Sequence, residues 1–582
     1  MIFKNKYNNY ELHPYTEIKG YNDHAWEDYD SVISKLKQNI GEKESAVVCF
    51  DLYPGVNKEE IIALARKLKP DILIDMEELA KSEEVLNREF RDFITDDRVF
   101  GIMCHKRLED FFDFEKMAAA RQQLSIQKKG LVVIAGVGAG LLREGDITVY
   151  CDITRWEVQL RYREGMPNWH CTNYDAPNLE KYKRGFFIEW RLADRYKKER
   201  FESFDYILET EEKGNPKLIT GEAFRAGLKE LSRRPFRLEP YFDPGVWGGH
   251  WMKEHFNLDK EKENFAWSFD GVPEENAINL AFGEVKVKLP AIDLVFYCPK
   301  DLLGERVYGR FGTEFPIRFD LLDTMGGGNL SLQVHPMMEY IQDAFGMHYT
   351  QDESYYLLDT DEDEDTYVYL GVKKGVDKDA MARDLREAEI GKIQFPAETY
   401  INEIPVKKHD HILIPAGTIH CSGKNTMVLE ISATPYIFTF KLWDWGRVGL
   451  DGIPRPTHVD HGLKNIQWER DTDWIYNEIV HQEQILEERE GMKLERTGLH
   501  NQEFINTFRY TFTVPVSVKM EDSVQMMNLV EGESASIESV DGTFQPFEVH
   551  YAETVIVPAS VGEYRIVPGN GMCMMIIAAI RK

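Results

Sequence analysis

The sequence predicts a multidomain protein in which an α/β layered domain precedes an all-β part. A chain of 582 residues is too long for a single hydrophobic core, since a domain typically holds ~150 residues. Between residues 41 and 215, continuous apolar runs alternate with amphipathic stretches, which is typical of buried parallel strands and their covering helices. After a proline-rich stretch at 233–245, short segments alternate apolar and polar residues with a period of two, as half-buried strands do.

The composition excludes several classes of partner. The chain has 70 Lys and Arg against 99 Asp and Glu, a formal charge of −29, which should repel nucleic acid and anionic membrane surfaces. An anionic ligand would therefore need a local cluster of cations. Seven cysteines without a Cys-x-x-Cys pair favour a reducing cytoplasm, and no uncharged apolar run has transmembrane length.

The first domain is expected to follow an N-terminal extension at 1–40. Residues 46–51 form a buried apolar run, residues 58–68 an amphipathic helix, and residues 71–75, 98–103 and 130–136 repeat the strand pattern. The turn after the first strand lacks the Lys-Ser/Thr pair of a phosphate loop. The glycine run at 136–140 is not followed by a helix with a ribose-binding acid, so we do not favour dinucleotide binding.

Two stretches at 150–163 and 181–198 are richer in Arg and Lys than the rest. Their arrangement faintly resembles the lid and sugar-contacting part of nucleoside kinases, which would make 41–215 a kinase-like α/β domain without a phosphate loop. We favour the alternative, a solvated and salt-bridged helical face, because charge runs are usually that. A linker is expected at 216–240.

The β part carries a group of metal-capable side chains. Gln333 and His335 are two apart on an apolar strand, so both project to the same face. Glu353 starts a second aromatic strand, and His420 follows a Pro-Ala-Gly turn. Two histidines, a carboxylate and a carboxamide oxygen make an open Zn²⁺ or Mn²⁺ site with room for a ligand. His348, His409 and His411 are nearby alternatives that we take as core or rim histidines.

These segments resemble the type I mannose-6-phosphate isomerases over roughly residues 236–582. The matching pieces, in the family's order, are Trp-Gly-Gly (247–249), Leu-Ser-Leu-Gln-Val-His-Pro (330–336), Glu353 with Tyr-Tyr-Leu-Leu, Ile-Pro-Ala-Gly-Thr-Ile-His (414–420), Val-Leu-Glu-Ile (428–431) and Trp-Asp-Trp-Gly-Arg (443–447). The resemblance implies a zinc-dependent cupin enzyme that interconverts a phosphorylated aldose and ketose, with one Zn²⁺ per chain held by Gln333, His335, Glu353 and His420.

The cupin fold divides the β part into a metal-binding barrel at 241–480 and a second jelly-roll barrel at 481–582. A short helix at 377–388 is expected as an insertion, and residues 484–491 are expected as a charged helix. The second barrel repeats the Ile-Val-Pro-Ala-Ser pattern at 556–560 without a following histidine, so its role is expected to be structural.

The resemblance also implies the remaining site residues. Ser331, Arg318 and Arg447 would contact the phosphate, where the family has a lysine in place of Arg318. Lys441 would stand near the reacting carbons, one residue off from a family arginine. As an alternative, Lys441 and Arg447 form salt bridges with Asp444 or Asp451. Glu430 is the preferred general acid/base because burial in an apolar strand raises a carboxyl pKa; it could instead orient a metal-binding histidine.

One position departs from the family. Gln351 replaces a lysine often proposed as catalytic, two residues before the metal-binding glutamate. The favoured hypothesis is isomerisation of mannose 6-phosphate to fructose 6-phosphate through a cis-enediolate. A sugar-phosphate sensor without turnover is the second hypothesis, and a bifunctional kinase-isomerase is the third.

Overall fold

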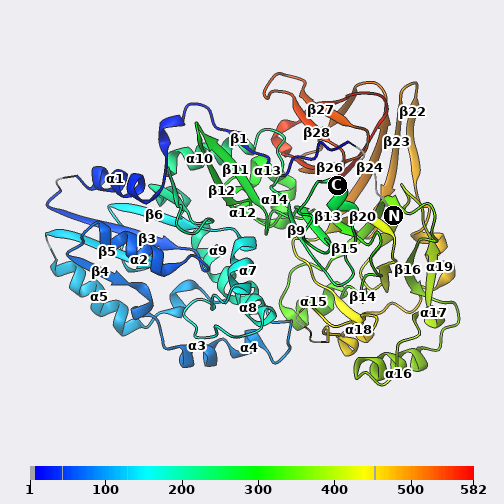
Figure 1. Ribbon diagram of the computed structural model, residues 1–582, viewed down its shortest axis with the longest axis horizontal. Coiled ribbons are helices and arrows are strands. Elements are labelled where there is room, and N and C mark those ends of the chain that lie inside the picture. The colour runs from blue at the N-terminus through cyan, green and yellow to red at the C-terminus, as the bar shows by residue number, and fades with distance from the viewer. Residues whose placement is uncertain (1–6, 42, 128, 451, 453) are drawn as a thin grey trace.

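The N-terminal domain is built on a seven-stranded sheet. The computed structural model describes residues 7–582 except 42, 128, 451 and 453. The strand order is β2-β8-β7-β6-β3-β5-β4, in which β3 to β7 are parallel and β8 and β2 add antiparallel strands (Figure 1). The strands are β2 (Ala25–Glu27), β3 (Ser45–Leu52), β4 (Ile72–Asp75), β5 (Gly130–Gly136), β6 (Ile147–Asp152), β7 (Tyr206–Glu209) and β8 (Lys217–Thr220).

Helices cover this sheet because each presents an apolar face to it. Helix α2 begins after Asn57, whose side chain caps the Glu59 amide, and it buries Ile61, Ile62, Leu64 and Ala65. The principal helices are α1 (Tyr29–Ile40), α2 (Lys58–Lys67), α5 (Phe114–Ile126), α7 (Arg155–Arg163), α8 (Asn178–Arg184), α9 (Trp190–Lys198) and α10 (Gly221–Leu231). The α/β layers expected from the sequence are therefore present, and in Figure 1 α7 and α8 lie on the side facing the β part.

Three expectations about this half were wrong. Residues 98–103 form a loop rather than a strand, because Phe100 is buried against the β part instead of entering the sheet. The expected linker at 216–240 contains β8 and α10, which buries Phe224, Leu228 and Leu231. The described part of the expected extension supplies α1 and the edge strand β2.

The β part consists of two pairs of antiparallel sheets. In the first pair, the order β18-β15-β20-β13-β10-β9 faces β17-β16-β19-β14-β21. Their bounds are β9 (Tyr241–Asp243), β10 (Trp267–Gly271), β13 (Arg318–Asp323), β14 (Leu332–Val334), β15 (Asp352–Thr360), β16 (Tyr367–Val372), β17 (Ile401–Pro405), β18 (His411–Ile414), β19 (His420–Ser422), β20 (Thr426–Ala433) and β21 (Phe440–Trp443).

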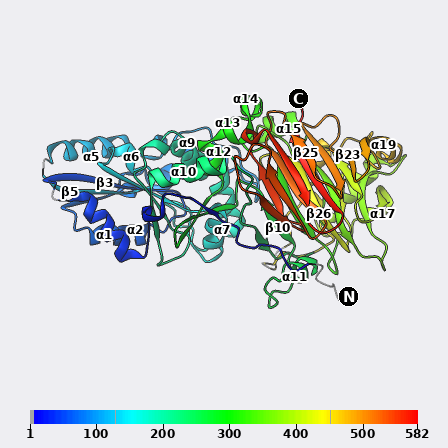
Figure 2. The same ribbon diagram turned by 90° about the horizontal axis from the view of Figure 1, so that it is seen from above.

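The second pair has the orders β22-β23-β24-β31-β26-β29 and β25-β30-β27-β28, and Figure 2 shows β25 and β26 in the half of the molecule opposite to β3 and β5. Its strands are β22 (Gln484–Arg489), β23 (Met492–Gly498), β24 (Ile505–Phe512), β25 (Val516–Lys519), β26 (Gln525–Glu531), β27 (Ser534–Ser539), β28 (Phe547–His550), β29 (Thr554–Val557), β30 (Glu563–Pro568) and β31 (Cys573–Ile580). Among the described strands, neither pair closes into one hydrogen-bonded barrel.

Two local features refine the sequence reading of the β part. The insertion expected at 377–388 is helix α16 (Lys378–Glu389), which Asp377 caps. The segment at 484–491 is strand β22, not a charged helix. The reason is the Glu490-Gly491 turn, in which Gly491 has φ +78° and joins β22 to β23 as a hairpin.

The described N-terminal segment runs along the β part before the chain enters the first sheet. The Asn9 amide donates to the Glu533 carbonyl at 3.0 Å, and the backbone N–H of Glu11 donates to the Glu553 carboxylate at 2.7 Å. Strand β1 (Thr16–Glu17) then pairs in parallel with β11 (Ala277–Phe282), which also pairs with β12 (Val285–Pro290). We call residues 7–17 the N-terminal strap.

The two halves of the molecule also share buried charges. The Lys197 ammonium on α9 lies 2.7 Å from the Asp152 carboxylate and 2.5 Å from Asp293 on α12 (Ile292–Tyr297), which precedes β14 in the chain. Such a paired group is costly to separate, so the halves should form one unit. Within the described residues, none of the helices has the length and apolar character needed to cross a lipid bilayer.

Candidate metal centre and substrate cavity

Three of the side chains put forward as metal ligands converge inside the first pair of sheets. The Glu353 carboxylate lies between the two histidines, with one oxygen 3.1 Å from His335 Nε2 and the other 2.7 Å from His420 Nε2. The three potential ligand atoms lie within 4.8 Å of one another and all three residues are buried. Strand β15 supplies Glu353, while His335 and His420 come from the opposite sheet.

Both histidines are oriented for metal binding by their other ring nitrogen. His335 Nδ1 lies 2.9 Å from the Phe438 carbonyl and His420 Nδ1 lies 2.9 Å from the Thr418 carbonyl. A carbonyl can only accept, so Nδ1 carries the proton and Nε2 offers its lone pair to the centre. The buried atoms His335 Nε2 and Glu353 Oε1 have no hydrogen-bond partner in the described chain. This donor set fits a divalent cation.

Gln333 joins the same cluster. It pairs in register with His420 across β14 and β19, and its side-chain amide lies 3.2 Å from His420 Nε2. Turning the amide about its last torsion would present the oxygen instead of the nitrogen, which is what a metal ligand requires. The four residues expected to bind the metal are thus brought together.

The charges in the cluster support each other. Burial alone would raise the pKa of Glu353, but His335 and His420 hold that pKa well below its ordinary range. Burial alone would lower the pKa of His335, and the Glu353 carboxylate reverses this, so the pKa of His335 is raised. The carboxylate is therefore ionised, as a ligand of a cation must be.

Glu430 on β20 lines the cavity beside the cluster. Burial, together with the charges of Glu353 and Asp320, raises the pKa of Glu430 well above its ordinary value. Ser432 Oγ donates to Glu430 Oε1 at 2.9 Å, and the Gln351 amide donates to the same oxygen at 3.1 Å. The alternative role, in which Glu430 orients a metal-binding histidine, would need a hydrogen bond between the two. Among the described residues, the partners of Glu430 are Ser432 and Gln351 instead. A raised carboxyl pKa is what a group that both accepts and returns a proton near neutral pH requires.

Gln351 forms a neutral bridge at the position where the resemblance led us to expect a lysine. Its Nε2 donates to Glu353 at 2.9 Å as well as to Glu430, and its Oε1 accepts the backbone N–H of Phe438 at 3.0 Å. Because the amide supplies no charge, it does not oppose the rise in the pKa of Glu430, whereas a lysine at this position would lower that pKa.

Lys441 and Arg455 bring positive charge to the cavity wall. Lys441 is paired in register with Gln333, and burial together with the neighbouring Arg455 lowers the pKa of Lys441 to about 7. Arg455 Nε lies 2.6 Å from the Asp444 carboxylate and was missed by the sequence reading. Its only sequence signal is its place between Pro454 and Pro456, shortly after the Trp-Asp-Trp-Gly-Arg segment.

Of the three residues expected to bind phosphate, one lines the cavity and two do not. Ser331 lines the cavity and donates to Asp444 at 2.8 Å. Arg447 pairs with Asp444 at 2.5 Å and donates to the Asn329 carbonyl, as the salt-bridge alternative expected, while Asp451 lies outside the described residues. Arg318 is buried and pairs with Asp320 at 2.8 Å. Neither Arg447 nor Arg318 is among the residues that line the cavity.

The alternative histidines stand apart from the metal cluster. His348 lies 3.6 Å from Glu314 on the surface, and His409 Nδ1 lies 2.8 Å from the Tyr356 hydroxyl. His411 Nε2 lies 2.8 Å from Ser354 Oγ, and burial lowers the pKa of His411 to about 3.

One cavity of about 810 Å³ joins the metal cluster to the N-terminal domain. Its wall includes Phe100, Trp156 and Tyr182 of that domain, none of which the sequence reading selected. Phe100 stacks on Phe438 with ring centroids 4.6 Å apart, and its loop is held by the Asp97 carboxylate, which accepts the Phe100 N–H at 2.7 Å. Phe438 is the residue whose carbonyl orients His335.

The Arg- and Lys-rich stretches are not the solvated faces that we favoured. Arg155, Lys181 and Lys197 are all buried, because α7 to α9 are covered by the β part and by the sheet. Arg155 and Lys197 form ion pairs inside the molecule, whereas Lys181 donates to the backbone carbonyl of Tyr174 at 2.6 Å. The kinase-like lid remains a prediction.

Backbone N–H groups of the glycine run at 136–140 are already hydrogen-bonded to a side chain of the protein. Asp51 Oδ1 accepts the N–H groups of Gly138 at 2.9 Å and Ala139 at 3.2 Å, and Oδ2 accepts that of Gly140 at 3.2 Å. A buried carboxylate thus occupies the amide groups that a phosphate would need.

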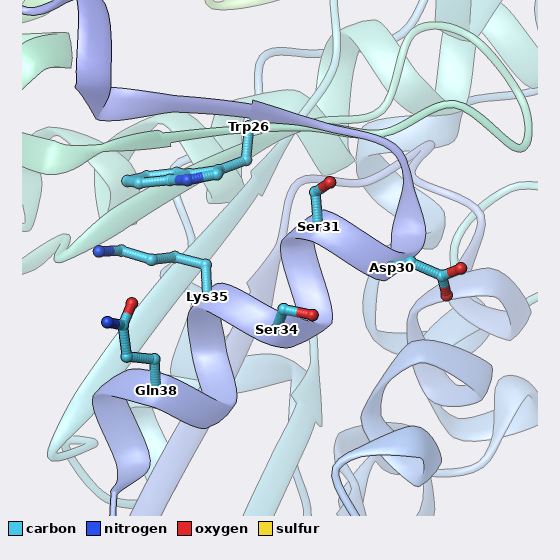
Figure 3. A pocket seen from close by; sticks show the side chains of 6 residues that line it. All are labelled: Trp26, Asp30, Ser31, Ser34, Lys35 and Gln38. Atoms are coloured by element: carbon cyan, nitrogen blue, oxygen red, sulfur yellow. The ribbon is translucent and has the colours of Figure 1, made fainter.

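A second hollow of about 510 Å³ lies open on α1. Figure 3 shows the Lys35 side chain beneath the Trp26 indole, with its ammonium 4.5 Å from the ring centroid, and Asp30 directed away from both. Its polar groups do not converge, and we assign no chemistry to it.

Comparisons with known proteins match the two halves separately. A family model described as a domain of unknown function (DUF8485) matches residues 28–233. The mannose-6-phosphate isomerase ManA of Bacillus subtilis is 22% identical over 351 residues, which cover 59% of this chain and 99% of that protein. The mannose-6-phosphate isomerase of Streptococcus mutans is 24% identical over 231 residues, 39% of this chain and 66% of that protein.

Among solved structures, the mannose 6-phosphate isomerase of Bacillus subtilis aligns with a TM-score of 0.47 and 19% identity, covering 60% of this chain and 99% of the other. The curated relatives are mannose-6-phosphate isomerases, which confirms the resemblance drawn from the motifs.

Proposed function

We propose that this protein is a metal-dependent isomerase that interconverts mannose 6-phosphate and fructose 6-phosphate. The observation that carries the proposal is the buried cluster of His335, Glu353 and His420, which opens on a cavity beside a carboxyl group of raised pKa, Glu430. The names of the curated relatives point to the same substrate. Zinc, or manganese in its place, would be held by these three residues and Gln333.

The reaction moves a proton between C2 and C1 through a cis-enediolate. Glu430 is the group that takes the proton from one carbon and returns it to the other, since its raised pKa suits both steps at neutral pH. Lys441 stands beside Gln333 and would face the oxygens that gain charge. A bound divalent cation would polarise the carbonyl and hydroxyl oxygens of the sugar.

The phosphate would bind away from the metal ligands, where the cavity carries positive charge. Ser331 can donate its hydroxyl, and Arg455 supplies a planar guanidinium suited to phosphate oxygens. Arg447 and Arg318 would contribute indirectly, because Arg447 pairs with Asp444 and Arg318 pairs with Asp320. All seven cysteines are unpaired and buried, which fits the cytoplasmic location that we propose.

The test combines metal analysis with an exchange assay. The purified protein should contain one transition metal, form fructose 6-phosphate from mannose 6-phosphate, and incorporate deuterium in deuterated water. His335→Ala should lose the metal and the activity together, while His348→Ala, which removes a surface histidine, should keep both. Full turnover by His335→Ala would contradict the proposal.

A sugar-phosphate sensor is the second candidate, favoured by Gln351 in place of the family's lysine. A sensor would bind mannose 6-phosphate saturably without exchanging the C2 proton. The kinase-isomerase stays third, because Asp51 occupies the glycine-loop amides; ATP hydrolysis by the protein would revive it.

A further inference from the structure

The substrate cavity extends beyond the half of the molecule that carries the metal cluster. Its volume of about 810 Å³ lies in the upper part of the range of roughly 300–1,000 Å³ for small-molecule sites. The N-terminal domain contributes part of the wall through α7 and α8. The ManA relative is matched over 99% of its length by 59% of this chain, so this wall is additional to what such relatives contain.

The added wall is aromatic and hydrogen-bonding. Trp156 on α7 stacks on Tyr241 with centroids 4.0 Å apart, and Tyr241 stacks on Phe269 at 4.9 Å. These three stacked rings therefore connect the N-terminal domain to β9 and β10. Ordered aromatic side chains beside polar groups are suited to the apolar faces and hydroxyl rims of sugar rings.

A single carboxylate ties the polar groups of this wall together. Glu275 accepts a hydrogen bond from the Tyr182 hydroxyl at 3.1 Å, from the Tyr241 hydroxyl at 2.6 Å and from the Gln159 amide at 3.3 Å. These groups offer both donors and acceptors to a ligand, as hydroxyl groups require. Two of them, Gln159 and Tyr182, belong to the N-terminal domain.

Carboxylates and guanidinium groups are mixed in the wall near the N-terminal domain. Glu275 and Asp320 line it, and so do Arg98 and Arg163. The Arg163 guanidinium is engaged by Asp243 through two contacts of 2.8 Å, and Arg98 donates to the Pro454 carbonyl at 3.1 Å. Lys441 lies beside Gln333, and Arg455 lies beside Asp444. A second ring bound at the N-terminal domain would therefore meet charges that already have partners, which suits an uncharged ring better than an anionic one.

Resting on the proposed isomerase function, we propose that the substrate is a sugar phosphate extended by a second, uncharged sugar ring, and that Trp156, Gln159 and Tyr182 bind that ring. The N-terminal domain is then a specificity element of the enzyme. The metal cluster and Glu430 act on the reducing end, while the second ring occupies the space between the two domains.

The test compares two probes on the full-length, zinc-loaded protein: mannose 6-phosphate, and β-1,4-mannobiose with a phosphate on C6 of its reducing ring. The disaccharide phosphate should have a kcat/KM about tenfold higher, since buried aromatic and hydrogen-bonding contacts dominate recognition. Trp156→Ala and Gln159→Ala should each lower the ratio of the two kcat/KM values about tenfold. Phe114→Ala, which removes an exposed aromatic side chain of the same domain, should leave the ratio unchanged.

The outcomes separate this inference from the function beneath it. Turnover of mannose 6-phosphate without turnover of the disaccharide phosphate, or an unchanged ratio in both cavity variants, would overturn the inference and leave the isomerase intact. If neither probe reacts, the isomerase proposal fails, and calorimetric binding decides the inference. Tighter binding of the disaccharide phosphate that weakens in Trp156→Ala would support it, and equal affinity for both probes would overturn it.

Discussion

Replacing Phe100 with alanine should weaken metal binding, although this residue lies in the N-terminal domain and touches no metal ligand. Its ring stacks on Phe438 at 4.6 Å and meets the edges of Phe345 and Phe440 at 5.4 and 5.5 Å. Phe438 in turn offers its carbonyl to His335 Nδ1 and its N–H to Gln351. Removing the ring leaves a hole directly behind the segment that orients the metal-binding histidine.

Two magnitudes follow from these contacts. Phe100 is 5% exposed, and truncating a buried phenylalanine to alanine costs about 3–5 kcal/mol of folding free energy. Releasing the carbonyl that orients a histidine ligand typically costs about 10–100-fold in metal affinity. Phe100→Leu, which keeps most of the apolar volume, should retain most of both.

The assay is zinc affinity by competition with a chromophoric chelator, run beside urea unfolding of the zinc-free protein. The reasoning requires that Phe100→Ala lose affinity by a larger factor than Phe100→Leu while both remain folded. A folded Phe100→Ala variant that is destabilised but binds zinc as tightly as the wild type would refute it, because the ring would then be packing alone.

Three further predictions follow from the site. Glu430→Gln should lower kcat by about 10²–10⁴ and retain the metal, because an amide cannot exchange the proton; metal loss in this variant would show a structural role instead. Gln351→Lys should lower the pKa of Glu430 by placing a cation between it and Glu353, so the pH profile of kcat should move to lower pH. An unmoved profile would exclude Glu430 as the titrating group. His411 has a pKa of about 3 in the folded protein against an ordinary 6.5, so its stabilising effect is complete above pH 6.5 and is lost as the pH falls toward 3. At pH 5 the loss is about 2 kcal/mol, and urea unfolding of His411→Asn at pH 7.5 and 5 should show a pH dependence smaller by that amount.

The metal cluster could be predicted because strand periodicity pairs Gln333 with His335, and because the resemblance to type I mannose-6-phosphate isomerases supplied the full set with Glu353 and His420. Gln333 and His335 are two residues apart on a strand, so they lie on the same face. The Pro-Ala-Gly turn predicts the start of the strand that carries His420. The N-terminal sheet was accessible for a similar reason, since β3 and β5 are uninterrupted apolar runs.

What the sequence could not provide were contacts between the two halves. The loop around Phe100 has the composition of a strand, and only the apolar surface beyond it decides that the ring leaves its own domain. The charges of Arg155 and Lys197 suggested a surface because their partners Asp194 and Asp293 are 39 and 96 positions away in the chain. Arg455 had no motif that related it to the cavity.

The N-terminal strap has a consequence for the order in which the chain is made. Asn9 and Glu11 precede their partners Glu533 and Glu553 in the chain by 524 and 542 residues, so they are synthesised long before them. Domains generally fold as they are synthesised, at about 5–20 residues per second, so Asn9 and Glu11 stay undocked for tens of seconds while the rest of the molecule forms. The docking of Asn9 and Glu11 is therefore a late step of assembly, whereas β1 can pair with β11 as soon as residues 277–282 have been made.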